Sequence, residues 1–195
     1  SAGNNLLMAV GDEEMKERQG LHCFDARTGD EHWRVATDTS IKNQPVVTGN
    51  LCVAVSVAGQ IHAVDVVTGS MRWKVRMPGY PDRWNYASPA ADGQSMYVGT
   101  QQGLLSHRLK DGQCEWQAPL EYDVFTWRCA AGPVLHGELV LFFQARRGIV
   151  AVSRKTGELR WRRAVAEHGG FADQYPSPVV VDGRLVSGGD SGHLV

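Results

Sequence analysis

Residues 63–73 read AVDVVTGSMRW, which places a Thr-Gly turn between an alternating apolar stretch and a tryptophan. The alternation over residues 63–66 predicts a half-buried β-strand, and Thr68-Gly69 is typical of the turn that ends such a strand. A second strand should follow and carry Trp73, four residues beyond the glycine. The stretch therefore predicts a β-hairpin with its largest side chain at a fixed place.

The same arrangement occurs four times along the chain. The copies end at tryptophans that lie 40, 43 and 45 residues apart: Trp33, Trp73, Trp116 and Trp161. The turn glycines lie four residues before them: Gly29, Gly69, Gly112 and Gly157. A second feature, proline, recurs at intervals of 44, 44 and 45 residues: Pro45, Pro89, Pro133 and Pro178. Two independent features with one period indicate a repeat protein.

Each repeat reads as four short strands. In the second unit we expect strands in QPVVTGN, at 51–57, in QIHAVDV and in SMRWKVR, with a turn signal every 8 to 12 residues. We find no segment with helical periodicity, so the fold class is all-β. Tandem four-stranded units of 40 to 45 residues are typical of a β-propeller, whose sheets are called blades. We assign residues 1–195 to one propeller domain, with units at about 1–40, 41–84, 85–128, 129–173 and 174–195.

A blade cannot bury both of its faces alone, so neighbouring blades must pack on each other. A tryptophan on the outer strand can cover the adjacent blade where a small residue (Ala63, Ala151) and the turn glycine leave room. Each such side chain buries on the order of 200 Å². We therefore interpret the four tryptophans and the four turn glycines as structural blade-docking residues.

The spacing A-x-D-x-x-T-G-x-x-x-W resembles the tryptophan-docking motif of the pyrroloquinoline quinone (PQQ)-like propeller repeats. Residues 63–73 match it at Ala63, Asp65, Thr68, Gly69 and Trp73, and the other copies match in part. The resemblance covers essentially the whole chain. It implies a ring of seven or eight blades, of which the four to five units here are a part unless they close alone as a small propeller. The first unit should lack its inner strand and the last its outer strand.

The resemblance implies two classes of function. Some members are quinoprotein alcohol or sugar dehydrogenases that bind PQQ and a metal, and others are non-catalytic binding modules, such as the lipoprotein of outer-membrane assembly. The chain has no Cys-Cys pair, no CxxCH and fewer than half the residues of such an enzyme, so we favour a scaffold without a cofactor that binds another protein. The alternatives are a fragment of an oxidoreductase with PQQ and calcium, or a sensor or regulatory domain of a larger enzyme.

Composition limits the partners. The net charge of −1 offers no general attraction to nucleic acid, and no apolar run reaches the length of a membrane span. No signal peptide is visible, yet the resemblance suggests a periplasmic or outer-membrane-associated protein in a bacterium. Four isolated cysteines are interpreted as free core thiols, with one disulfide as the alternative and Cys114–Cys129 as its nearest pair: Cys23, Cys52, Cys114 and Cys129.

We expect the binding surface on the loop face, defined by the loops that join second to third strands and fourth strands to the next unit. Trp84 and Trp127 fall there, each 11 residues after a repeat tryptophan. Aromatic and arginine side chains are enriched at interface hot spots. The candidate partner-binding residues are Arg83, Trp84, Tyr86, Trp127, Arg128, Arg146, Arg147 and Tyr175. The alternative is that each ring only covers its own blade. A second copy that completes the ring is a further candidate partner.

Other polar residues give weaker signals. The arginines and lysine of the fourth unit, among them Arg154, are interpreted as a solvated blade surface rather than an anion site. His22 and His62 occupy equivalent strand positions, but no third ligand is in register, so no metal site is expected.

Overall fold

The computed structural model describes residues 5–10, 18–79, 85–100, 103–119, 131–144, 148–164 and 177–186. These residues form seventeen β-strands in five antiparallel sheets and contain no α-helix. The expected all-β class is confirmed, and three of the sheets have the expected four strands.

The strands follow the repeat. The first sheet consists of β1 (Asn5–Val10), β2 (Gly20–Asp25) and β3 (Glu31–Ala36). The second consists of β4 (Val46–Thr48), β5 (Leu51–Val55), β6 (Gln60–Asp65) and β7 (Met71–Arg76). The third consists of β8 (Ala90–Ala91), β9 (Ser95–Thr100), β10 (Gly103–Arg108) and β11 (Cys114–Pro119). The fourth consists of β12 (Val134–His136), β13 (Leu139–Gln144), β14 (Gly148–Ser153) and β15 (Leu159–Arg163). The last consists of β16 (Val179–Val181) and β17 (Arg184–Val186). We call these sheets blades 1 to 5.

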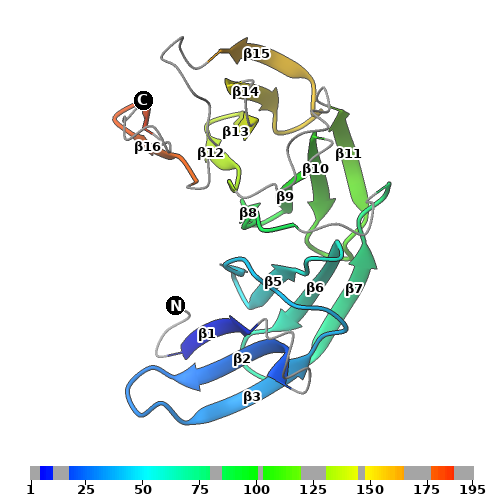
Figure 1. Ribbon diagram of the computed structural model, residues 1–195, viewed down its shortest axis with the longest axis vertical. Coiled ribbons are helices and arrows are strands. Elements are labelled where there is room, and N and C mark those ends of the chain that lie inside the picture. Colours follow the sequence, from blue (N-terminus) through cyan, green and yellow to red (C-terminus); the bar gives the residue numbers. More distant parts are fainter. Residues whose placement is uncertain are drawn as a thin grey trace.

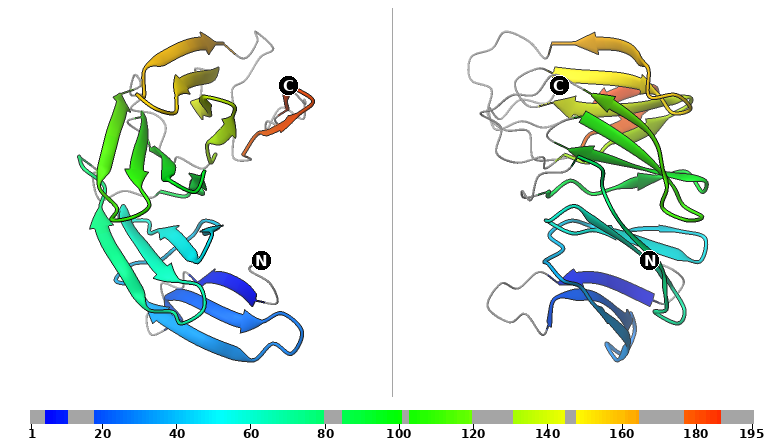
Figure 2. Two further views of the ribbon diagram at one scale, coloured as in Figure 1. Left: turned by 180° about the vertical axis from the view of Figure 1, so that it is seen from behind. Right: turned by 90° about the vertical axis from the view of Figure 1, so that its right-hand side faces the viewer.

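The blades follow one another around an arc that is open on one side (Figures 1 and 2). The short first strands β4, β8, β12 and β16 lie on its concave side, where neighbouring ones contact each other. The last strands β7, β11 and β15 lie on the convex side (Figure 1). This radial arrangement is that of a β-propeller.

A hydrophobic cluster fills each seam between blades 1 to 4. Between blades 2 and 3, for example, Val53 and Ile61 of one blade pack with Met96 and Leu105 of the other. Equivalent clusters lie between blades 1 and 2 and between blades 3 and 4. Since strand side chains alternate between the two faces, each inner blade sends one set of apolar residues to each neighbour.

The repeat tryptophans connect neighbouring blades. Trp33 of blade 1 lies against the Gly69 turn of blade 2, and its indole nitrogen Nε1 donates a hydrogen bond to the Val66 carbonyl oxygen at 3.0 Å. Trp73 lies in the same way on the Gly112 turn of blade 3, with 2.8 Å to the Leu109 carbonyl. Trp116 repeats the contact one blade further.

For Trp116 the partner turn contains Gly157, and the acceptor at 2.9 Å is the Arg154 carbonyl oxygen. The glycine is required at these turns on two grounds. Its φ is positive, at +71° for Gly69, and a Cβ there would lie 2.7 Å from Trp33 Cδ2. The tryptophan therefore occupies the space that the missing side chain leaves free.

Contrary to our expectation, the small residue of the motif does not make room for the tryptophan of the adjacent blade. Ala63 is the cross-strand partner of Trp73 within its own blade, and Ala151 is that of Trp161. A β-bulge follows this position in all four copies, after Cys23, Ala63, Ser106 and Ala151. The small side chain thus makes room beside the tryptophan in its own sheet, and the turn glycine makes room in the next blade.

The aspartate and threonine of the motif close the turn. Asp65 Oδ1 accepts hydrogen bonds from the backbone amides of Val67 and Thr68, both at 2.9 Å. Thr68 Oγ1 accepts one from the amide of Ser70 at 3.2 Å. In blade 3, which lacks both residues, Arg108 and Asp111 form an ion pair at 2.6 Å across the equivalent turn.

The two outer blades differ from the inner ones. A Cβ at Gly29 would have nothing within 4 Å, although the φ of +77° matches that of the other turn glycines. Trp161 is 39% exposed, and none of the four described docking turns lies against it. Blade 1 thus presents a docking turn with no tryptophan on it among the described residues, and blade 4 presents a tryptophan without a described docking turn.

Candidate functional site

Hydrogen bonds between loops define the two faces of the arc. At one end of the strands, the amide of Val66 donates to the Asn50 carbonyl, joining the β6–β7 turn to the β4–β5 turn. We call this the turn face. At the opposite end, the amide of Val57 donates to the Ser40 carbonyl at 2.8 Å, joining the β5–β6 loop to the segment between blades 1 and 2. That end is the loop face.

The described part of the loop face is organised around the β5–β6 loop. Besides Ser40, Val57 also contacts the segment between blades 2 and 3, whose Asn85 amide donates to the Val57 carbonyl at 3.3 Å. Asn43 Nδ2 donates to the Val55 carbonyl at 2.8 Å. One loop therefore holds the connections on both sides of blade 2. Sequence reasoning missed these residues because a lone asparagine or serine in a loop carries no motif.

Of the predicted partner-binding residues, the structure describes Tyr86, which is half-buried beside the buried Asn85. The others lie outside the described residues: Arg83, Trp84, Trp127, Arg128, Arg146, Arg147 and Tyr175. Whether the loop face gathers these side chains stays a prediction.

The loop-facing side of blade 2 also contains buried polar groups. His62 is 1% exposed, and among the described residues neither of its ring nitrogens has a hydrogen-bond partner. Burial, assisted by the nearby Lys74 ammonium, lowers the pKa of His62 to about 4. The imidazole is therefore neutral near pH 7.

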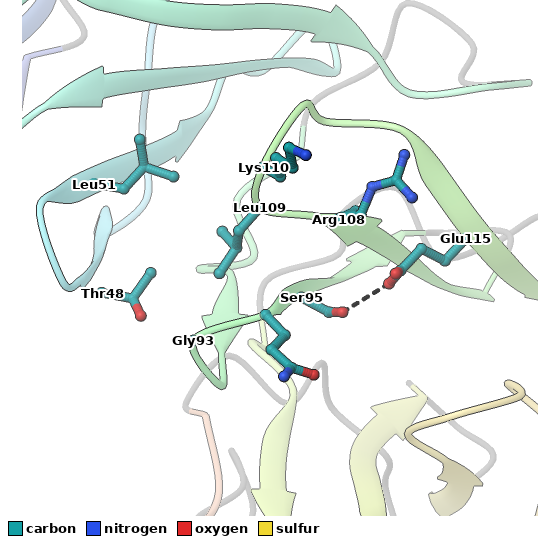
Figure 3. A pocket seen from close by; sticks show the side chains of 9 residues that line it. Thr48, Leu51, Gly93, Ser95, Arg108, Leu109, Lys110 and Glu115 are labelled. Atoms are coloured by element: carbon teal, nitrogen blue, oxygen red, sulfur yellow. Dashed lines mark hydrogen bonds between the residues drawn. The ribbon is translucent and has the colours of Figure 1, made fainter.

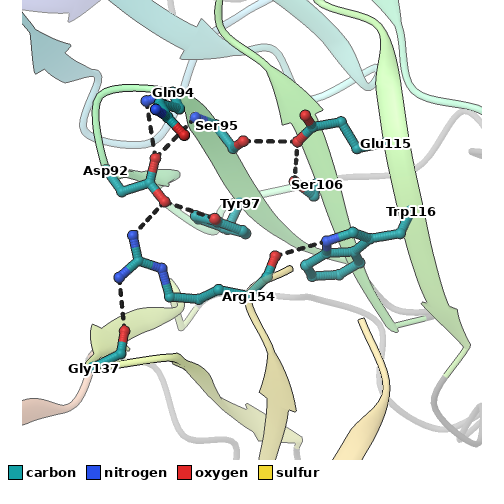
Figure 4. A network of polar contacts seen from close by, with 9 residues as sticks. All are labelled: Asp92, Gln94, Ser95, Tyr97, Ser106, Glu115, Trp116, Gly137 and Arg154. Carbon is teal, nitrogen blue, oxygen red and sulfur yellow. Dashed lines mark hydrogen bonds and ion pairs between the residues drawn. The ribbon is translucent and has the colours of Figure 1, made fainter. Parts of the chain in front are cut away.

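On the turn face, a polar network crosses the seam between blades 3 and 4 (Figure 4). The Arg154 guanidinium of blade 4 forms an ion pair with Asp92 of blade 3 and donates to the Gly137 carbonyl at 2.7 Å. The Tyr97 hydroxyl also donates to Asp92, at 2.8 Å. Arg154 is thus a seam residue, which corrects its interpretation as part of a solvated surface.

The carboxylate in this network is held ionised. Burial alone would raise the pKa of Asp92, but hydrogen bonds from Arg154, from the amides of Ser95 and Gln94 and from Tyr97 outweigh it. The pKa of Asp92 consequently lies well below its usual range. Since Trp116 donates a hydrogen bond to the Arg154 carbonyl oxygen, Arg154 takes part in both the tryptophan contact and the ion pair between these blades.

The seam between blades 2 and 3 contains an open groove of about 510 Å³, which also lies on the turn face (Figure 3). Its walls come from the β4–β5, β8–β9 and β10–β11 turns. The lining residues are Thr48, Leu51, Gly93, Gln94, Ser95, Arg108, Leu109, Lys110 and Glu115. The sequence did not predict this groove, because its shape depends on how two blades pack against each other.

The described cysteines are free thiols. Cys23 and Cys52 are buried as expected, and burial together with the neighbouring Cys23 raises the pKa of Cys52 to about 12. Cys114 is exposed on β11, so its assignment to the core was wrong: the outer strand has no further strand beside it. Cys129 lies outside the described residues, so its pairing with Cys114 stays untested.

In the part of the chain that the structure describes, no three histidine, cysteine, aspartate or glutamate side chains lie together as candidate metal ligands. No helix of that part is long and apolar enough to cross a membrane.

Sequence comparison relates the chain to two kinds of known protein. The family model of the outer membrane protein assembly factor BamB matches residues 2–126 and 123–195. The chain is 24% identical over 198 residues to the outer membrane protein assembly factor BamB of Moranella endobia, covering 91% of this chain and 50% of that protein. The chain thus spans about half the length of this curated relative. It is also 26% identical over 121 residues to the quinoprotein alcohol dehydrogenase PedH of Pseudomonas putida, covering 60% of this chain and 20% of the enzyme.

Solved structures share the fold. BamB from Moraxella catarrhalis superimposes with a TM-score of 0.75 at 22% identity, over 97% of this chain and 59% of that one. A europium-containing methanol dehydrogenase superimposes with a TM-score of 0.66 at 15% identity, over 86% of this chain and 41% of the enzyme. The structural likeness establishes the propeller, and the family model, which spans nearly the whole sequence, distinguishes between the branches. The chain belongs to the family of the outer membrane protein assembly factor BamB.

Proposed function

We propose that the protein is a non-catalytic propeller scaffold that binds another protein through its loop face. The observation that carries the proposal is the match of the BamB family model to residues 2–126 and 123–195. The relatives in this family are named as factors in the assembly of outer membrane proteins, so the proposed partner is a protein of that machinery. The corresponding location is the periplasmic side of a bacterial outer membrane.

The fold supports a binding role for this face. The strand ends at the loop face are fixed by the cores between blades, and the β5–β6 loop ties two blade connections together. Loops held by a rigid scaffold are the usual place for recognition residues. The predicted contact residues are Trp84 and Trp127, with the neighbouring Arg83, Tyr86, Arg128, Arg146, Arg147 and Tyr175.

The test uses a photo-crosslinking amino acid at position 84 or 127, with exposed Arg34 on the outer strand β3 as the matched control. We expect adducts with a protein of the assembly machinery from positions 84 and 127, and none from position 34. The double variant W84A/W127A should lose the partner and keep its circular dichroism spectrum. Unchanged partner binding by that variant would refute the assignment of the site.

The second candidate is a PQQ-dependent oxidoreductase, favoured by the sequence similarity to the Pseudomonas putida quinoprotein alcohol dehydrogenase. Reconstitution with PQQ and calcium, followed by dye reduction with alcohols and sugars, distinguishes the two candidates. Bound quinone with turnover would replace the scaffold proposal.

We also propose that a second copy of the chain can complete the ring. The support is the exposed apolar surface of the outer blades, which includes Leu6 and Met8 in blade 1 and Trp161 in blade 4.

A further inference from the structure

We propose that the two ends of the arc fit each other, so that Trp161 of one copy docks on the Gly29 turn of a second copy. The inference rests on the proposal that a second copy completes the ring, and it names the contact by which this happens. Blades 1 and 5, the two ends of the arc, border its open side (Figure 1). Two arcs related by a two-fold axis would contain the contact twice and leave neither end open.

The Gly29 turn of blade 1 has the structure of a docking turn. Asp25 Oδ1 accepts hydrogen bonds from the amides of Arg27 and Thr28, both at 2.8 Å, in the way described for blade 2. The Gly29 amide donates to the Asp25 carbonyl oxygen at 2.8 Å, and φ of the glycine is +77°. A Cβ here would have nothing within 4 Å, whereas at the covered turns it would collide with an indole. The receptor is therefore formed before a tryptophan covers it.

Trp161 is the matching side chain at the other end. It pairs with Ala151 beside a β-bulge, as Trp73 pairs with Ala63 beside a bulge in blade 2. At each covered turn the indole nitrogen donates to the carbonyl oxygen three residues before the docking glycine, which belongs to Val66, Leu109 or Arg154. In the Gly29 turn this position is Ala26. We therefore expect the Trp161 indole to donate to the Ala26 carbonyl oxygen of the second copy.

The free face of blade 1 is apolar in the same way as a buried face of blade 2. By the repeat register, Leu6 and Met8 of β1 correspond to Cys52 and Ala54 of β5. Cys52 and Ala54 are fully buried in the cluster between blades 1 and 2, whereas Leu6 and Met8 are 50% and 45% exposed. Covering them with a preceding blade would remove hydrocarbon from water. This face is therefore suited to pack against blade 4 of a second copy.

The strands of the two ends complement each other as well. In the described part of the chain, blade 5 has β16 and β17 at the positions of a first and second strand, and blade 1 has β1 to β3 at the second to fourth. One complete blade therefore arises from β16 of one copy and β1 to β3 of the other. Since β1 and β17 hold the same position, one must yield. We expect β1 to stay, because it pairs with β2 over six residues and β17 pairs with β16 over three.

Trp161→Ala and Gly29→Asn test the contact from its two sides by sedimentation analysis. Asparagine tolerates left-handed backbone, and its side chain would occupy the space that the indole needs. Since the dimer contains the contact twice, each variant should raise the dimer dissociation constant by about a hundredfold or more. Below that concentration the chain is a monomer, whose stability does not depend on this contact.

Gly49→Asn is the matched control. Gly49 also has a positive φ, at +56°, and a Cβ there would have nothing within 4 Å. It lies between β4 and β5 of blade 2, away from both ends of the arc. The control should therefore dimerise like the unmodified chain.

A mixture of the two variants tests which residues meet. The Gly29→Asn chain retains Trp161, and the Trp161→Ala chain retains the Gly29 turn. A mixed dimer therefore has one intact contact, and either homodimer has none. Native mass spectrometry separates the three species by mass, and the mixed dimer should be favoured over either homodimer by about tenfold. Circular dichroism should show that both variants are folded.

Three results would overturn the inference: dimers of both variants as stable as those of the unmodified chain, an equal loss in the Gly49→Asn control, or a mixed dimer no more abundant than random pairing gives. The first of these leaves ring completion through other residues standing. A monomer of the unmodified chain at every concentration would instead refute ring completion itself. The W84A/W127A variant should dimerise normally, so failure of this contact and failure of the loop-face site can be told apart.

Discussion

At the residue scale, the motif has a separate physical task for each of its members. In blade 2, the Asp65 carboxylate caps two backbone amides, Thr68 supports the next one, and Gly69 adopts a left-handed conformation under Trp33. Hydrogen bonds from Arg72 and from these amides lower the pKa of Asp65 to about 2, which keeps the cap charged. The motif thus builds a turn that the preceding blade can cover.

His62 predicts a pH dependence of stability at the same scale. Its pKa in the folded protein, about 4, lies below the ordinary 6.5 because the side chain is buried. Between these values the unfolded chain binds a proton that the folded chain does not, so stability present above pH 6.5 is lost as the pH falls toward 4. The loss should reach at most about 3 kcal/mol.

Urea titrations from pH 7.5 to pH 4 test this prediction. The variant His62→Leu should show a flatter decline in the free energy of unfolding than the unmodified chain. His32→Leu is the control, since His32 is exposed on β3. Equal slopes for the His62 variant and the unmodified chain would contradict the prediction.

At the element scale, the hairpin formed by the third and fourth strands of each blade serves as the receptor for the tryptophan before it. Gly112 lies in a hairpin that a tryptophan covers, and Gly29 lies in one that no described tryptophan covers. Both glycines have a positive φ, but only Gly112 lies under an indole ring. An added methyl group therefore has the same backbone cost at both positions and a steric cost at one. Alanine substitutions at these two positions therefore separate the cost of backbone strain from the cost of displacing the tryptophan.

Gly29→Ala should lower the free energy of unfolding by about 1–2 kcal/mol, the cost of left-handed backbone for a residue with a Cβ. Gly112→Ala should lower it by roughly 1–3 kcal/mol more, because the new Cβ would lie 2.6 Å from Trp73 Cε3. Urea unfolding followed by circular dichroism measures both values. If the two variants lose the same stability, Trp73 does not depend on the open space at Gly112.

At the scale of the whole molecule, apolar exposure is concentrated at the ends of the arc. Blades 1, 4 and 5 contain six of the eight large hydrophobic residues that are exposed in the described part: Leu6, Met8, Leu159, Trp161, Val179 and Val181. Between blades 1 to 4, by contrast, the apolar faces of neighbouring blades are buried in hydrophobic clusters. Surfaces of this type favour association.

We therefore expect native mass spectrometry of the 21.4 kDa chain to show a dimer or larger species that grows with protein concentration. Trp161→Ala should shift the population toward the monomer. Val67→Ser, at an exposed apolar residue of blade 2 away from both ends, should leave it unchanged. A monomer at every concentration would refute the proposed ring completion by a second copy.

The fold class and the family could be inferred from the amino-acid sequence alone. The tryptophan and proline periods, the alternation of apolar residues and the turn signals are local patterns, and antiparallel strands that follow one another along the chain pair with their neighbours. Strand ends were less well predicted: β5 ends at Val55, two residues early, because the Gly59 amide donates to the Ser56 carbonyl and closes a turn there. The partner-binding residues of the loop face stay predictions.

The contacts between neighbouring blades become visible in the three-dimensional structure and not before. Asp92 and Arg154 lie 62 residues apart, and no pattern along the chain pairs them. The turn-face groove depends in the same way on Thr48 and Leu109, which come from different blades and are unremarkable in sequence. Contacts across a seam depend on side-chain shape and on the relative placement of two sheets, whereas the repeat specifies only the sheet itself. This is why the architecture could be inferred from the sequence and the groove could not.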